Sequence, residues 1–149
     1  MPNHAELARA LFMQGYNCAQ AVFCAFCDVT GLEIDVAARM ASSFGGGLGR
    51  LREVCGTVSG AALVLGIVKG YADPGDYAAK KAHYALVQAF AQRFRAANGS
   101  IVCRELLRGV GATEGGAPEA RTAEYYKKRP CPNLAYCAAE ILDEMLKDG

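Results

Sequence analysis

The sequence of 149 residues lacks the features that mark membrane, exported and nucleic-acid-binding proteins. Its longest apolar run, Val58 to Val68, is far shorter than the ~20 residues that a membrane-spanning helix needs. No basic region precedes an apolar stretch at the N-terminus, so we expect no signal peptide and a cytoplasmic protein. The 16 basic and 15 acidic residues nearly cancel and are scattered, which argues against nucleic-acid binding. We therefore expect a soluble chain with neither a membrane nor a nucleic acid as a partner.

Strand patterns are missing as well, because no segment alternates apolar and polar residues convincingly. The length fits one domain, and a hydrophobic fraction of 52% is enough for a buried core. We predict an all-α fold, a single-domain helical bundle of about five to seven helices over residues 1–149. The expected helices cover residues 3–14, 18–29, 35–44, 55–68, 77–97, 100–107 and 132–145, and a short helix lies around 121–127 within a long loop.

A glycine run, Gly45 to Gly49, cannot form a stable helix. It lacks the Lys-Ser/Thr of a phosphate-binding loop and follows no strand, so nucleotide binding is not expected. We interpret it as a tight turn that brings Cys55 close to its neighbours. Arg50 and Arg52 flank this cysteine, and we interpret them as solvated loop charges rather than as partners of a thiolate.

Seven cysteines in a chain without an export signal indicate reduced thiols rather than a disulfide framework. Four of them lie in or next to the first turn of four different predicted helices: Cys18, Cys55, Cys103 and Cys131. Unpaired amides and the helix dipole favour a thiolate there, which predicts a lowered pKa and a nucleophile or a metal ligand. If these helix starts meet at one end of a bundle, the four thiols converge. The alternative is that cysteine serves simply as a small apolar core residue.

The remaining cysteines and both histidines fit structural roles better. Cys24 and Cys27 form a Cys-x-x-Cys, but it lies inside a predicted helix rather than at the start of one after a strand, so core packing is favoured. Cys137 falls on another face of the last helix and is also assigned to the core. His4 and His83 have no neighbours that suggest a ligand or a base, and we expect both on the surface.

The order of motifs resembles that of a known family, the C-GCAxxG-C-C family of redox-active proteins. The resemblance spans Asn17 to the last helix, and two of its four blocks are specific. The blocks are Tyr16-Asn17-Cys18-Ala19-Gln20-Ala21-Val22, Phe44-Gly45-Gly46-Gly47-Leu48-Gly49-Arg50 with Cys55-Gly56-Thr57-Val58-Ser59-Gly60-Ala61, Cys103-Arg104-Glu105-Leu106-Leu107, and Cys131-Pro132. Val54 and Thr57 depart from the literal Gly-Cys-Ala of the family name.

The resemblance implies electron or thiol chemistry at the same four cysteines and names no substrate. Related blocks also occur in proteins with iron–sulfur clusters beside haem. Covalent haem is not expected here, since the chain has no Cys-x-x-Cys-His.

Two functional hypotheses therefore stay open, and a third is structural. The first is a dithiol–disulfide protein, an oxidoreductase in the broad sense, with an unknown redox partner. The second is a four-thiolate site for zinc or an iron–sulfur cluster, although spacings of 37, 48 and 28 residues match no zinc ribbon. The third is a structural or interaction module with incidental cysteines, in which the Gly56/Gly60 face is available to pack a second subunit. A homodimer is compatible with the sequence, which does not require it.

Overall fold

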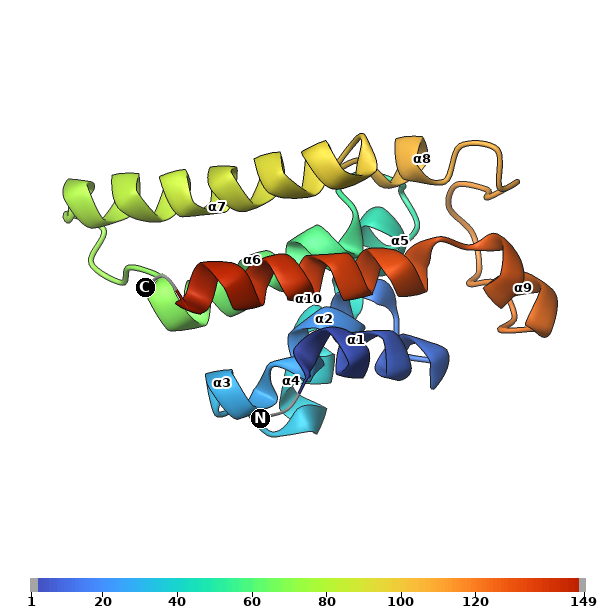
Figure 1. Cartoon of the computed structure of the whole chain (residues 1–149), viewed down its shortest axis with the longest axis horizontal. Coiled ribbons are helices and arrows are strands. Elements are labelled where there is room, and N and C mark those ends of the chain that lie inside the picture. The colour runs from blue at the N-terminus through green and yellow to red at the C-terminus, as the bar shows by residue number, and fades with distance from the viewer. Residues whose placement is uncertain (1–2, 148–149) are drawn as a thin grey trace.

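The computed structural model describes residues 3–147, and within them it confirms the all-α class (Figure 1). One isolated antiparallel bridge, between Val54 and Val102, is the only β-type pairing in that range. The elements are α1 (His4–Met13), α2 (Cys18–Ala25), α3 (Cys27–Thr30), α4 (Ile34–Ala41), η1 (Ser42–Phe44), α5 (Gly45–Leu48), α6 (Gly56–Lys69), α7 (Tyr77–Asn98), α8 (Cys103–Leu106), α9 (Ala123–Lys128) and α10 (Cys131–Lys147).

The helical elements are more numerous than the five to seven expected, because two of the expected helices are broken and the glycine run adds the short α5. The expectation that this run is not regular helix agrees with the non-helical backbone angles of Gly46 and Gly47 inside α5. The helix expected over 18–29 breaks at Phe26, whose backbone (φ −105°, ψ 20°) leaves the helical region, and it continues as α3. The helix expected over 35–44 is α4, which ends at Ala41, and the chain then continues as the 3₁₀ turn η1. These breaks turn the chain sharply around the central helices.

Local capping explains where the main helices begin. The Asn3 side chain accepts a hydrogen bond from the amide of Glu6, which fixes the start of α1. Asn17 and Gln20 form a complete capping box at the start of α2, with bonds of 2.8 and 2.9 Å. Asp76 caps α7 in the same manner by accepting from the amide of Ala79. The cap at Asn17 fixes the backbone next to Cys18.

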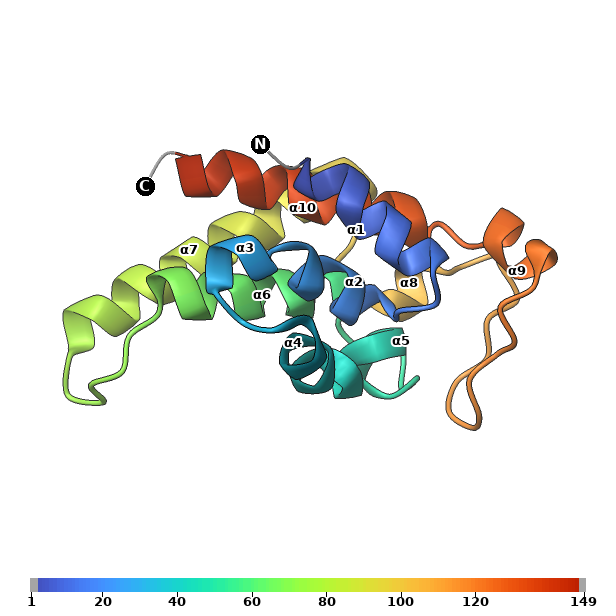
Figure 2. The same cartoon turned by 90° about the horizontal axis from the view of Figure 1, so that it is seen from below.

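The core forms around α2 and α6, which pack along each other (Figures 1 and 2). Almost every residue of α2 is buried, as expected for a helix that is apolar on all sides. In Figure 1, α10 runs between α7 on one side and α1 on the other. The largest fully buried side chains are Phe12, Phe23, Phe26, Phe90 and Phe94.

Two glycines allow α6 to approach α2 closely. A Cβ atom at Gly60 would lie 2.6 Å from the carbonyl oxygen of Ala19, and one at Gly56 would lie 2.4 Å from the sulfur of Cys18. The Gly56/Gly60 face is therefore filled by α2 of the same chain. The expectation that this face packs a second subunit is wrong.

His4 is buried, so the expectation of a surface role is wrong for this residue. Its Nδ1 lies 2.7 Å from Asp143 Oδ1 in α10, and its Nε2 lies 2.9 Å from Asp28 Oδ1 in α3. The ring also stacks on Phe26, with 4.1 Å between ring centroids. His4 thus joins α1, α3 and α10. The other histidine, His83, is half-buried and packs edge-to-face on Tyr71.

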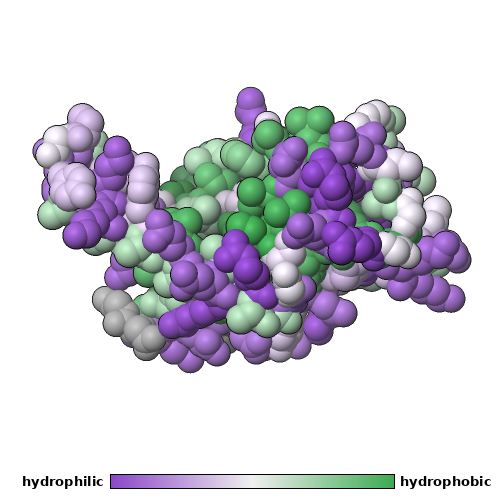
Figure 3. All heavy atoms as spheres, turned by 90° about the horizontal axis from the view of Figure 1, so that it is seen from above, coloured by the Kyte–Doolittle hydropathy of each residue, from purple (hydrophilic) through white to green (hydrophobic). Residues whose placement is uncertain are grey.

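The longest helix, α7, lies at the periphery, and only Phe90 and Phe94 of its 22 residues are buried. One face of the molecule is shown in Figure 3, where hydrophilic residues surround a smaller apolar area near the middle. Within residues 3–147, no helix combines the length and the apolar character needed to cross a membrane.

Candidate functional site

Four helices begin around one small cavity, and each contributes a cysteine to it. Cys18, Cys103 and Cys131 are the first residues of α2, α8 and α10, and Cys55 is the N-cap of α6. All four line a cavity of about 60 Å³, which we call the thiol cavity. Its volume has room for a few water molecules. Phe12, Leu106, Leu107 and Leu134 supply its apolar walls.

The glycine run forms a left-handed turn that brings two of these helix starts together. Gly46, Gly47 and Gly49 have φ angles of 67°, 71° and 55°, a region that glycine occupies without the usual penalty. A Cβ atom at Gly47 would lie 2.7 Å from Cys103 Cβ and equally close to the amide of Glu53. The turn therefore needs glycine at this position so that α8 can begin beside it.

Backbone hydrogen bonds then fix Cys55 next to Cys103. The amide of Cys55 donates to the carbonyl oxygen of Ile101 at 2.7 Å, and the amide of Cys103 donates to that of Glu53 at 2.6 Å. The expected role of the glycine run, to place Cys55 near its partners, agrees with this geometry. The run achieves it with a left-handed turn that sequence patterns do not reveal.

Burial raises the pKa values of Cys18, Cys55 and Cys131, which corrects the expectation of lowered values for these three thiols. Desolvation is the largest cause for Cys18 and for Cys131, whose pKa values are both raised, and it raises the pKa of Cys55 to about 12. Amide hydrogen bonds from Gly46 and Ala19 act in the opposite direction on Cys18 but are weaker than desolvation. Helix-start amides are thus present, and the burial of the sulfurs outweighs them.

The charge of one thiolate also opposes ionisation of the next. After desolvation, the strongest cause that raises the pKa of Cys55 is the charge of Cys18, and the same holds for Cys131. These couplings place the four sulfurs within electrostatic reach of one another. At neutral pH, Cys18, Cys55 and Cys131 are therefore thiols.

Arginine side chains form the polar wall of the thiol cavity, and sequence reasoning missed most of them. Arg52 is only 6% exposed, and its Nη1 donates to the sulfur of Cys103 at 3.7 Å, so its interpretation as a solvated loop charge is wrong. Arg129 is 7% exposed and stacks over the ring of Tyr125. Arg121 stacks over Phe12, with 4.2 Å to the ring centroid. For Arg129, the available signal was its position two residues before Cys131.

The other three cysteines lie outside the thiol cavity. Cys24 is buried in α2, and burial followed by the charge of Cys27 raises its pKa to about 11. Cys27 is half-buried at the start of α3, beyond the break at Phe26. Cys137 is half-buried in α10, where its sulfur accepts a hydrogen bond from Asn98 Nδ2 at 3.5 Å. Core packing describes Cys24 well, whereas the other two are packed against the core.

The four thiols have the donor atoms that zinc and iron–sulfur clusters prefer. Within residues 3–147, however, no three His, Cys, Asp or Glu side chains are arranged as a group that could hold a metal ion. The donor chemistry fits a metal and the arrangement of the side chains does not.

A family model with the description "Putative redox-active protein (C_GCAxxG_C_C)" matches residues 16–145. The chain belongs to this family. The match begins just before α2 and ends in α10, so it includes all four helix starts that border the thiol cavity. It confirms the family resemblance seen in the sequence motifs. No curated protein and no solved structure matches the chain. The C_GCAxxG_C_C description is the functional statement that the comparisons provide.

Proposed function

We propose that the protein carries out thiol–disulfide or electron-transfer chemistry through Cys18, Cys55, Cys103 and Cys131. One observation supports this above all: four helix starts, far apart in the sequence, bring four free thiols to a single buried cavity. Membership of a family described as redox-active supports it as well. Chance packing of small apolar residues would not require four cysteines at four helix starts.

The chemistry that fits this arrangement is a two-electron exchange. A cavity thiolate attacks one sulfur of a partner disulfide, which forms a mixed disulfide and releases one partner thiolate. A second cavity thiol, after losing its proton, attacks the mixed disulfide and releases the second partner thiolate. Two cavity cysteines end as a disulfide, and the two electrons and two protons pass to the partner.

Cys103 is the best candidate for the attacking thiol. The guanidinium of Arg52 contacts its sulfur and can stabilise the negative charge that develops there during exchange. Cys18, Cys55 and Cys131 are protonated at neutral pH, so the one that resolves the mixed disulfide must first lose its proton, and that proton passes to the departing partner thiolate. In this scheme the cavity keeps a single negative charge at a time, as the repulsion among the sulfurs favours.

Single-cysteine replacements test this assignment. The reduced protein is incubated with an aromatic disulfide, and mixed disulfides are identified by mass spectrometry. If Cys103 attacks, replacing the cysteine that resolves the mixed disulfide by Ser should cause a mixed disulfide to accumulate on Cys103. Cys103→Ser should abolish the reaction. Cys137→Ser is the matched control and should behave like the original chain. Four cavity thiols that neither react nor pair at any accessible potential would contradict the proposal.

A four-thiolate metal or iron–sulfur site is the second candidate. The four sulfur donors that line one cavity favour it, although no three of these side chains, within residues 3–147, are arranged to hold a metal ion. Protein purified without oxygen distinguishes the two by its visible spectrum and its iron, zinc and acid-labile sulfide content. Stoichiometric iron and sulfide that disappear in Cys18→Ser or Cys55→Ser would establish a cluster and exclude the simple dithiol model. A colourless, metal-free protein with titratable thiols would favour thiol exchange.

A further inference from the structure

A second, larger cavity adjoins the thiol cavity. It has a volume of about 290 Å³ and shares Arg52, Arg121, Tyr125 and Arg129 with the thiol cavity as common walls. Arg50 and Glu119 complete its charged lining. We call this space the arginine vestibule. The shared side chains stand between a molecule bound there and the thiol cavity.

The vestibule carries a large excess of positive charge. Its lining contains four arginines and one carboxylate, a net charge of +3, in a chain whose formal net charge is only +1. Two of these arginines, Arg52 and Arg129, are more than nine-tenths buried. Burying unbalanced charge is costly, so a site that retains it is expected to bind a counter-ion.

Backbone carbonyl groups hold three of these arginines in place without neutralising them, whereas Arg129 is paired with the Glu119 carboxylate. Arg50 Nε donates to the carbonyl oxygen of Gly115 at 2.9 Å, and Arg52 Nε donates to that of Thr113 at 2.9 Å. Arg121 donates to the carbonyl oxygens of Phe12 and Tyr16, both at 3.0 Å. The guanidinium groups are thus fixed in position before any ligand arrives, which lowers the entropic cost of binding one.

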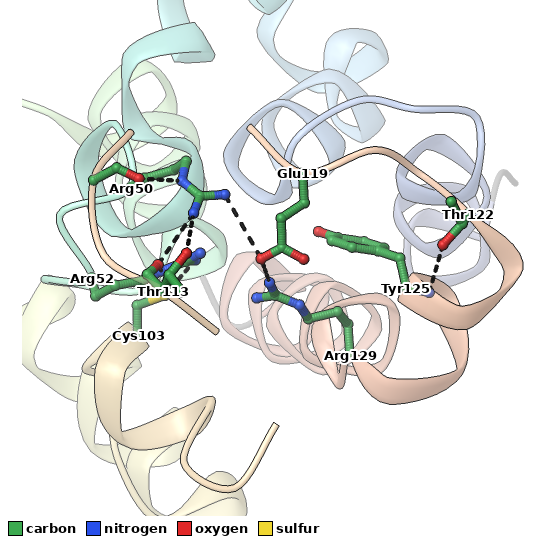
Figure 4. A network of polar contacts seen from close by, with 9 residues as sticks. Arg50, Arg52, Cys103, Thr113, Glu119, Thr122, Tyr125 and Arg129 are labelled. Carbon is green, nitrogen blue, oxygen red and sulfur yellow. Dashed lines mark hydrogen bonds and ion pairs between the residues drawn. The ribbon is translucent and has the colours of Figure 1, made fainter. Parts of the chain in front are cut away.

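Glu119 marks the place that an anion would take. Its carboxylate bonds to Arg129 and lies 3.8 Å from Arg50 Nη1, between the two side chains (Figure 4). Guanidinium groups recognise carboxylate, phosphate and sulfate by the same forked geometry. Arg52 continues the path inward, since it bonds to Thr113 with one nitrogen and to Cys103 with another.

We propose that the arginine vestibule binds an oxyanion group of a small molecule, of the carboxylate, phosphate or sulfate type, and presents that molecule to the thiol cavity. The volume fits a small molecule rather than a protein segment. The arginines alone support binding of the anion. Reaction of the bound molecule at the cysteines depends in addition on the proposed function. Glu119 competes with the ligand for the same arginines.

Binding of inorganic sulfate to the reduced protein, measured by calorimetry at low ionic strength, tests the first part. Arg50→Gln should weaken sulfate binding about tenfold, as for loss of one charged hydrogen-bonding partner. Glu119→Gln should strengthen it about fivefold, since the competing carboxylate is gone. Glu114→Gln is the matched control, because Glu114 pairs with Arg104 outside the vestibule. Absence of sulfate binding, or equal affinity in all these proteins, would overturn the proposal. If Arg50→Gln folds poorly, the comparison of Glu119→Gln with the original chain still decides the outcome.

The second part is tested by comparing two thiol reagents, the dianionic 5,5′-dithiobis(2-nitrobenzoate) and the neutral 4,4′-dithiodipyridine. We divide the rate of reaction of the cavity cysteines with the dianionic reagent by their rate with the neutral reagent. This ratio should fall about tenfold in Arg50→Gln and rise in Glu119→Gln. An unchanged ratio would overturn delivery of an anionic substrate while leaving thiol chemistry intact. If sulfate binds as expected and neither reagent reacts with the cavity cysteines, anion binding is supported and the proposed function fails.

Discussion

At the scale of single residues, Cys55 shows how burial and backbone placement compete. The residue caps α6, where free amides favour a thiolate, yet it is only 4% exposed. Desolvation is the larger effect and raises its pKa to about 12. The Thr57 hydroxyl, 3.1 Å from the sulfur, lowers the value without reversing its direction. A position at a helix start therefore predicts a reactive cysteine only if water also reaches it.

The raised pKa of Cys55 makes stability depend on alkaline pH. Between the ordinary value of 9.0 and about 12, the unfolded chain loses a proton that the folded chain keeps. The free energy of unfolding of the reduced protein should therefore be unaffected by this thiol below pH 9. Above it, the thiol should lower that free energy by about 1.4 kcal/mol per pH unit until pH 12. Urea unfolding of the original chain and of Cys55→Ala measures the difference in slope. Equal slopes would show that Cys55 is not held as a thiol.

Gly56 keeps α6 close to the sulfur of Cys18. A Cβ atom there would lie 2.4 Å from that sulfur and 2.8 Å from the carbonyl oxygen of Phe44. We expect Gly56→Ala to lower the free energy of unfolding by about 1–3 kcal/mol and to speed alkylation of Cys18. Gly66→Ala is the control in the same helix, because nothing lies within 4 Å of its Cβ position. It should stabilise the protein by about 0.5–1 kcal/mol. A neutral Gly56→Ala would contradict the close packing.

Sequence reasoning succeeded for the cysteines where the signals were local. Asn17 is a cap in the sequence and in the structure, so the position of Cys18 at a helix start could be predicted. The pKa values could not, because burial depends on residues brought in from distant segments. Arg129 and Cys18, for example, are more than a hundred residues apart and line the same cavity. Arg52 looked like a loop charge because nothing nearby in the sequence shows that it is covered.

At the scale of elements, the left-handed turn over 46–50 shapes the site. Gly47→Ala would place a Cβ atom against Cys103 in addition to the strain of a positive φ. Gly49→Ala meets only the strain, about 1–2 kcal/mol, since nothing lies within 4 Å of its Cβ position. We expect the free energy of unfolding of Gly47→Ala to fall by a further ~1–3 kcal/mol, together with faster alkylation of Cys103. Urea unfolding and mass spectrometry after timed alkylation measure both. Indistinguishable variants would show that the turn does not position α8.

The helices themselves were largely predictable, and their interruptions were not. The range expected for α7, 77–97, agrees with Tyr77–Asn98 because the Asp76 cap and Gly99 are strong local signals. The break at Phe26 and the left-handed glycine turn depend on packing against other elements, to which a periodic pattern is insensitive. The glycine run was expected to form a tight turn, and only its handedness was missing.

At the scale of the whole molecule, His4 connects the N-terminal helix to two distant elements. Both ring nitrogens face carboxylates, Asp28 in α3 and Asp143 in α10. We expect His4→Ala to lower the free energy of unfolding by about 1–3 kcal/mol, since both hydrogen bonds and the stacking on Phe26 are lost. His83→Ala, which loses a ring contact with Tyr71, should cost about 1 kcal/mol or less. Urea unfolding of both variants provides the comparison, and equal losses would show that His4 does not join the helices.

The separation of the four cysteines along the chain has a consequence for the lifetime of the protein. A disulfide between any two of them would close a loop of at least 28 residues. By chain entropy such a loop stabilises the folded state by about 3.5–5 kcal/mol, which makes the bond about 75–105 mV harder to reduce than in the unfolded chain. The reduced chain would open more often and be cut sooner by proteases than the oxidised chain. The amount of the protein in a cell would then rise with the fraction of the chain that carries the disulfide.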